Sequence, residues 1–287
     1  MNLEVDYLAR VARPGTDLYY SLLFLSKERQ EAATALYAYQ REIINISLEC
    51  SEISVAHTKL QWWREEIDRL FLGNPRHPIT QSLVTATRQY QLSQPLFLSV
   101  IEAATRDLYL VQSLYPTLKA LIYYCEGISG SISMLIAQIC GYTHTETQKY
   151  ANTLGVALHL YYLLRNTRQY ADKGFLHIPQ DQLMSFKVST KDIFNGYNPT
   201  GQVNLFTYQI NLIHQYFKDS LSYLNKGDYI SQQIGLIQIS LSLATLNAIK
   251  EDGYLLLEKK TSLTPLHKLW LAWLTSKRAR WGLVPKC

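Results

Sequence analysis

The sequence is poor in cysteine, in charged residues and in long apolar runs, and each shortage excludes a class of protein. The first ten residues contain two acids and no apolar run, which is unlike a signal peptide. The cysteines have no metal-ligand spacing, so we expect reduced thiols in a cytoplasmic protein. They stand at Cys50, Cys125, Cys140 and Cys287.

Charged residues make up 18% of the chain, and the formal net charge is +5. This mild excess is compatible with an anionic ligand or a membrane surface, and it is too weak to indicate nucleic acid. The seven histidines are scattered, without a His-x-x-x-His pair that would form a metal site. No nucleophile–base arrangement or glycine-rich phosphate loop is present. We therefore expect no nucleic-acid partner and no catalytic centre of these kinds.

Membrane-spanning runs and interdomain linkers are also missing. The longest apolar candidate, 132–140, is shorter than the roughly 18 residues that a membrane span needs, so it predicts a buried helix. No Gly/Ser linker, charge run or low-complexity tract divides the chain. Because hydrophobic residues make up 47% of the sequence, we expect one domain over residues 1–287.

What the sequence does contain is helical periodicity, with almost no strand signal. This pattern predicts an all-α protein of about ten helices. Thr145 and Gln148 suggest a capping box for a central helix, and 196–201 predicts a loop. The other predicted helices cover 27–50, 58–72, 79–91, 94–113, 117–140, 203–225, 230–259 and 265–274.

The most informative stretch is 154–179, LGVALHLYYLLRNTRQYADKGFLHIP. Apolar residues recur in it at three- and four-residue spacing, and Gly174 and Pro179 mark its end. One helix face mixes polar and apolar side chains, which is typical of a cavity lining. An ordinary core helix with satisfied polar groups would give the same pattern. The members of that face are His159, Tyr162, Asn166 and Tyr170.

This stretch resembles the second signature of the squalene/phytoene synthase family, whose members join two prenyl diphosphates head to head. Two aspartates of that signature are replaced here by Asn166 and Tyr170, and its glutamine and asparagine by His159 and Tyr162. The residues that match without a gap are Leu154, Gly155, Ala157, Leu158, Arg165, Gly174 and Pro179.

An earlier string resembles the front of the family's first signature. It reads Tyr-Ala-Tyr-Gln-Arg, from Tyr37 to Arg41, and the acidic positions that follow it hold Ile44, Asn45 and Leu48. On a helix, Tyr37, Ile44 and Leu48 share a face with Arg41. The two signature helices are therefore expected to form opposite walls of one pocket.

The resemblance extends over nearly the whole chain and looks nearest to bacterial presqualene diphosphate synthase-like proteins. It implies the isoprenoid (terpenoid) synthase fold, a single bundle of helices around a central cavity. The other strings that carry it are 59–66, 73–78, 115–117, 124–125, 130–131, 248–254 and 268–271.

In the family, the aspartates hold Mg²⁺ ions that neutralise charge on the departing diphosphate. Mg²⁺ prefers carboxylate oxygens, whereas the four replaced positions offer hydrocarbon, an amide and a phenol. Because losing one partner of a buried charged site costs about 2–5 kcal/mol, we expect no metal, no cofactor and no catalytic residue of the family type. The acids that could substitute lie off the facing stripe, at Glu42, Glu49, Glu52 and Asp172.

Basic residues remain beside the two walls and predict a metal-free anion site. The alternative is that these side chains are solvated, or paired with Glu42, Glu65 and Asp172. The candidate ligand-binding set is Tyr37, Arg41, His159, Tyr162, Arg165, Arg168 and Lys173.

Three hypotheses follow from the resemblance and the lost aspartates. The first is a pseudoenzyme that acts as an assembly or scaffold protein, as in a phytoene synthase-like assembly factor of respiratory complex I, with a protein partner at the membrane. The second is an active prenyltransferase that condenses two prenyl diphosphates with Mg²⁺ on atypical ligands. The third is a carrier of an isoprenoid or lipid. We expect a cytoplasmic protein, with a peripheral position at the inner membrane as a variant of the first hypothesis.

Overall fold

A computed structural model describes the chain except for residues 1–10, 51, 111–114 and 196–198. The described residues form 13 helices and no strand, when the continuous segment from Leu118 to Cys140 is counted once. The prediction of an all-α protein is therefore confirmed.

The first half of the chain builds one side of the bundle. In chain order it contains α2 (Asp17–Leu22), α3 (Lys27–Glu49), α4 (Ile53–Phe71), α5 (Pro78–Gln89), α6 (Gln94–Leu110), α7 (Leu118–Cys125), the π-turn η1 (Glu126–Gly130) and α8 (Ser131–Cys140).

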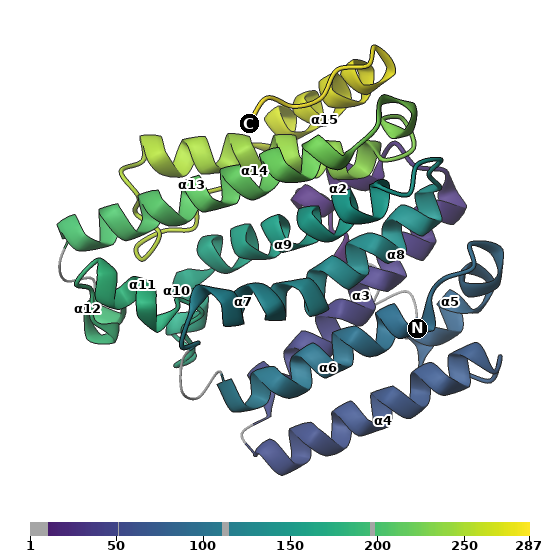
Figure 1. Cartoon of the computed structure of the whole chain (residues 1–287), viewed down its shortest axis with the longest axis horizontal. Helices are drawn as coiled ribbons and strands as arrows, with labels where there is room; N and C mark the ends of the chain where they lie inside the picture. The colour runs from purple at the N-terminus through teal and green to yellow at the C-terminus, as the bar shows by residue number, and fades with distance from the viewer. Residues whose placement is uncertain (1–10, 51, 111–114, 196–198) are drawn as a thin grey trace.

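The second half contains the central helix α9 and the helices that cover it. They are α9 (Thr147–Arg165), α10 (Thr167–Ala171), α11 (Gln180–Ser185), α12 (Thr190–Asn195), α13 (Pro199–Tyr223), the short 3₁₀ turn η2 (Lys226–Asp228), α14 (Gln233–Glu251) and α15 (Pro265–Arg280). Figure 1 shows α4 and α6 along one edge, α7 to α9 in the middle, and α13 to α15 along the other edge.

Several predicted boundaries were wrong, each for a local reason. The central helix breaks at Asn166, whose φ of −106° and ψ of 15° interrupt the helix before α10. The predicted helix 230–259 ends at Glu251 because Gly253 adopts φ +74° and turns the chain. The last helix runs beyond 274 to Arg280. Of the predicted loop 196–201, residues 196–198 lie outside the described chain, and α13 already begins at Pro199.

The predicted capping box at the start of the central helix does not form. The helix begins at Thr147, and its N-cap residue, Glu146, makes no side-chain cap. Instead, the carboxylate of Asp228 accepts hydrogen bonds from the backbone amides of Thr143 and His144 and from the Thr147 hydroxyl. These contacts hold the turn that leads into the helix, and the backbone amide of Gln148 bonds the Thr145 carbonyl oxygen rather than the Thr145 side chain.

The string 59–78 that resembles the family is tied together by one buried acid. The Glu66 carboxylate accepts from the backbone amides of Arg76 (2.7 Å) and His77 (2.8 Å) and from the Thr80 hydroxyl. It also pairs with Arg69 at 2.8 Å. These contacts fix the turn between α4 and α5.

One helix among the described residues is long and apolar enough to cross a membrane. It is Leu118–Cys140, and most of this segment is buried inside the protein. The sequence prediction of a buried helix there agrees with this packing, since core helices pass the same length and composition test.

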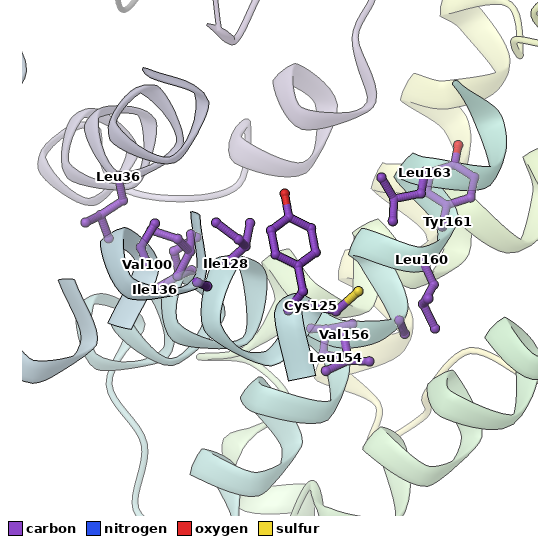
Figure 2. Packing of buried hydrophobic residues seen from close by; sticks show 14 of the residues in the cluster. Leu36, Val100, Cys125, Ile128, Ile136, Leu154, Val156, Leu160, Tyr161 and Leu163 are labelled. Atoms are coloured by element: carbon purple, nitrogen blue, oxygen red, sulfur yellow. The ribbon is translucent and has the colours of Figure 1, made fainter. Parts of the chain in front are cut away.

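The centre of the fold depends on a close contact between α9 and the π-turn. A Cβ atom on Gly155 of α9 would lie 2.3 Å from the Ser129 carbonyl oxygen and 2.6 Å from the Gly130 Cα. Glycine therefore allows the two backbones to touch, and the leucines and isoleucines around them pack as one cluster (Figure 2).

We predict that Gly155→Ala destabilises the protein, because the backbone that its methyl group would meet cannot move aside like a side chain. Overpacking of this kind costs about 1–3 kcal/mol, or more where backbone must shift. Urea unfolding measures the effect. Thr153→Ala, at a half-buried position of the same helix, is the control and should change stability far less. Equal stability of the two variants would contradict the proposed contact.

Candidate functional site

The structure brings the four residues of the predicted wall on the second signature together, despite the helix break. The ring centroids of His159 and Tyr162 lie 6.0 Å apart, and those of Tyr162 and Tyr170 lie 6.3 Å apart. His159, Asn166 and Tyr170 are buried, whereas Tyr162 is 46% exposed. Of these four side chains, only Tyr162 is therefore accessible to solvent to a large extent.

Six rings form what we call the aromatic cluster. Tyr170 contacts His177 with centroids 4.5 Å apart, and Tyr124 contacts His159 edge-on at 5.3 Å. The cluster consists of Tyr115, Tyr124, His159, Tyr162, Tyr170 and His177. His177 and Tyr115 were not singled out as site residues from the sequence, because nothing in a local pattern shows which distant rings meet.

One acid lies at the edge of this cluster. The Tyr115 hydroxyl donates to the carboxylate of Asp107 on α6, and Asp107 is 2% exposed. Burial raises the pKa of Asp107 to about 7. This carboxyl group is therefore partly neutral at neutral pH, and it is already engaged by a tyrosine.

The two histidines of the cluster are held neutral. Burial lowers the pKa of His159 to about 3 and that of His177 to about 4, with His177 adding to the effect on His159. The described residues offer no hydrogen-bond partner to His159 Nε2 or His177 Nδ1.

A short relay links the two signature helices. Gln40 of α3 donates from Nε2 to the Ser129 hydroxyl oxygen at 2.7 Å, and that oxygen lies 2.8 Å from His159 Nδ1. Gln40 stands in the first signature but was not among the predicted site residues, because its partner lies in the π-turn.

A lysine contacts Asn166, the first of the two replaced aspartate positions of the second signature. Lys260 Nζ donates to Asn166 Oδ1 at 2.6 Å, and Gln169 Oε1 lies 3.4 Å from the same ammonium. Burial lowers the pKa of Lys260, and the nearby Arg165 adds to this shift. Lys260 follows α14 in the sequence and carries no signal that could have identified it.

The first wall presents hydrocarbon where the family signature has acids. Ile44 and Leu48 are half-buried and pack against the core, and the Tyr37 hydroxyl accepts from Gln238 Nε2 at 2.8 Å. Arg41 is exposed. Ile44 and Leu48 therefore offer no oxygen ligand at the two positions where the family signature has acids.

The nearby acids of α3 open onto a different surface. A cleft of about 270 Å³ between α3 and α4 is lined by Glu42, Asn45 and Glu49, together with Lys59, Trp62 and His77. Asp172, on the other helix, pairs with Arg168 at 2.6 Å. Three of the acids that could have replaced the lost aspartates, Glu42, Glu49 and Asp172, thus lie in this cleft or in an ion pair.

Two of the basic residues predicted beside the walls are paired with acids. Arg165 pairs with Asp17 at 2.8 Å and donates to the Thr261 carbonyl, so it faces α2 and the segment before α15. Arg168 is held by Asp172, and Lys173 is exposed. Arg168 therefore follows the alternative prediction, in which the basic side chains pair with acids such as Asp172.

The residues at these positions do not fit Mg²⁺. Among the residues that the structure describes, no group of three or more His, Cys, Asp or Glu side chains could hold a metal ion. Mg²⁺ requires oxygen ligands in octahedral geometry and usually one or two carboxylates. Asn166 meets an ammonium, and Tyr170 keeps its proton, since burial raises its pKa far above the ordinary value.

A small pocket adjoins the cluster between α7, α9 and α13. Its lining is mostly leucine and isoleucine, with Tyr170 and His177 on one side. The volume of this cavity is about 30 Å³. That volume suits one or two waters, whereas pockets for organic ligands span about 300–1,000 Å³.

The architecture defines the class of protein. A squalene synthase from Alicyclobacillus acidocaldarius, HpnC, superposes with a TM-score of 0.69 at 20% identity, over 88% of this chain and 94% of that one. A dehydrosqualene synthase in complex with ligand reaches a TM-score of 0.81 at 16% identity, over 97% and 96% of the two chains. The chain therefore has the isoprenoid synthase fold, as predicted.

Sequence comparison then gives the family. The model described as squalene/phytoene synthase matches residues 11–267, so this chain belongs to the squalene/phytoene synthase family. It is 23% identical to a 15-cis-phytoene synthase of Synechococcus elongatus, over 90% of this chain and 87% of that protein. It is 24% identical to NADH dehydrogenase (ubiquinone) complex I assembly factor 6 of Rattus norvegicus, over 71% of this chain and 61% of that protein.

The buried titratable groups predict a particular dependence of stability on pH. His159 and His177 bind protons in the unfolded chain below about pH 6.5 but not in the folded chain until about pH 3 to 4, so they lower stability as pH falls through that window. Asp107 acts in the opposite direction, because the folded chain binds its proton below about pH 7 and the unfolded chain only below about 3.8.

We therefore predict that Asp107→Asn loses stability on acidification more steeply than the unmodified chain. The difference in slope should be about 1.4 kcal/mol per pH unit between pH 6.5 and 4.5, measured by urea unfolding at several pH values. His177→Phe should change the slope in the other direction. Parallel curves for all three proteins would contradict the assignment.

Proposed function

We propose that this protein is a family member without the Mg²⁺-dependent condensation of prenyl diphosphates, and that it acts as an assembly or scaffold protein. The observation that carries the proposal is the contact between Lys260 and Asn166. A family enzyme needs a metal-bound carboxylate at this position, and this chain has a protonated amine bound to a neutral amide.

Electrostatics makes the two arrangements incompatible. An ammonium at the metal position repels a divalent cation, and no carboxylate remains at the four signature positions to offset that repulsion. The acids Glu42 and Glu49 line the outer cleft, and Asp172 is paired with Arg168. The departure of a diphosphate from an allylic carbon would therefore lack the positive charge that the reaction uses.

The scaffold role is favoured over the carrier role by the small size of the pocket beside the aromatic cluster. The pocket beside the aromatic cluster is an order of magnitude smaller than pockets that hold organic ligands. The likeness to an assembly factor named for respiratory complex I supports a protein partner of that kind. Such a role requires a folded surface and no reaction centre.

We expect the purified chain to form no head-to-head product from farnesyl or geranylgeranyl diphosphate with Mg²⁺, because it lacks a site for the metal. Extraction into organic solvent followed by mass spectrometry measures the product. The phytoene synthase of Synechococcus elongatus, assayed beside it with geranylgeranyl diphosphate, is the positive control. Product at a rate near that of the control would overturn the proposal and support an active prenyltransferase with atypical ligands.

A second experiment separates the scaffold from the carrier. Capture with the tagged full chain, under mild detergent, is expected to enrich subunits of the NADH dehydrogenase complex. Native mass spectrometry of the same preparation should show the chain without a retained prenyl chain or lipid, because the pocket is too small. A stoichiometric isoprenoid in the spectrum and no enriched subunit would instead identify a carrier.

A further inference from the structure

Helix α15 exposes its large apolar side chains and buries small and polar ones. Its outward face, which we call the tryptophan face, carries Leu266, Trp270 and Trp273, and Trp281 follows directly after the helix. These side chains are 80%, 54%, 49% and 72% exposed, respectively. Spacings of four, three and eight residues place them on one side of the helix.

The inward face of the same helix is small and polar. Ala272 and Ala279 are buried against α14 and α2, and Thr275 donates to the Ser240 hydroxyl at 2.8 Å. Ser276 donates to Gln233 at 2.8 Å, and the ammonium of Lys268 pairs with Asp17 at 2.8 Å. The helix thus packs on the protein through polar contacts and leaves its large apolar side chains uncovered by the described residues.

Such an arrangement requires an explanation, because exposing several large aromatic side chains together is unfavourable in water. Scattered exposed hydrophobic residues are ordinary, whereas a contiguous set marks a binding surface. Figure 1 shows α15 at the edge of the bundle, so a large partner can approach it.

The charge of this segment indicates the chemistry of the partner. Residues 261–287 contain five basic side chains and no acid, so the formal charge of this segment equals the +5 of the whole chain. One of the five, Lys268, is buried with Asp17. The others lie at or beyond the end of the tryptophan face, and they are Lys277, Arg278, Arg280 and Lys286.

We propose that the tryptophan face and its basic end bind the surface of an anionic lipid bilayer. Tryptophan is favoured at the boundary between headgroups and hydrocarbon, because its ring is apolar and its N–H can still reach water. Lysine and arginine beside that boundary attract anionic headgroups. The helix lies on the membrane and does not cross it.

The same charges argue against a second copy of this chain as the occupant. Two copies that met through the tryptophan face would bring together two basic segments, and neither segment has an acid that could pair with the basic residues of the other. An acidic protein surface would satisfy the charges, but it would not require three exposed tryptophans on one face.

The inference deepens the proposed function by naming its membrane contact, and it does not rest on the loss of catalysis. We expect the full chain to sediment with vesicles of phosphatidylcholine and phosphatidylglycerol, and to remain in solution with phosphatidylcholine alone. Tryptophan fluorescence should shift to the blue on binding. Added salt should weaken the binding, because it screens the headgroup charge.

Two sets of variants test the two parts of the surface. Trp270→Gln with Trp273→Gln should weaken vesicle binding by at least about tenfold, because the inserted apolar area is removed. Lys277→Gln with Arg278→Gln and Arg280→Gln should weaken it by about 100-fold on anionic vesicles. Leu72→Gln with Met184→Gln removes comparably exposed apolar side chains from other elements and should leave binding unchanged.

Circular dichroism and thermal melting verify that each variant folds, which is expected because the substituted tryptophans face outward. Absence of binding to both kinds of vesicle overturns the proposal, as does equal binding by the tryptophan variant. Light scattering distinguishes a second copy, since a dimer dissociated by the tryptophan substitutions would assign the face to self-association. If the chain does not bind vesicles and the tryptophan variant fails to capture a respiratory subunit that the unmodified chain captures, the tryptophan face would be assigned to a protein partner. These results are independent of the diphosphate assay, so either proposal can fail alone.

Discussion

The close contact between α9 and the π-turn is the constraint on which the arrangement of the candidate site depends. Gly155 lets the backbone of α9 approach the Ser129 carbonyl, and this approach places His159 beside the Ser129 hydroxyl. The same hydroxyl accepts from Gln40 of α3, so three segments distant in sequence are linked at one oxygen. The aromatic cluster follows from this placement, because His159 contacts both Tyr124 and Tyr162.

The charges around Asn166 have reversed relative to what the family's metal chemistry needs. A metal site concentrates carboxylates around a cation, whereas here the protein supplies the cation itself through Lys260. Arg165 is drawn to Asp17, which also pairs with Lys268 of α15. The C-terminal segment therefore closes over the end of α9, and the same segment carries the tryptophan face on its outer side. The contact at Asn166 and the exposed tryptophans thus belong to one segment of the chain.

The sequence predicted elements well where the signal was local. The bounds of α3 and of the long segment from Leu118 to Cys140 agree closely with the predicted 27–50 and 117–140, because apolar residues recur at helical spacing in both. Prediction failed where a distant group decided the outcome. Arg165 pairs with Asp17 of a distant helix, and the periodicity of 117–140 does not predict the π-turn Glu126–Gly130, which contacts α9.

The sequence by itself determined the all-helical class, the family and the identity of the four positions that no longer carry aspartate. Those properties are written in residue types and spacings along one chain. Only the tertiary structure decided that Lys260 meets Asn166, that Arg165 is taken by Asp17, and that α15 turns its tryptophans outward. The physical reason is that charge pairing and burial depend on contacts between segments far apart in sequence.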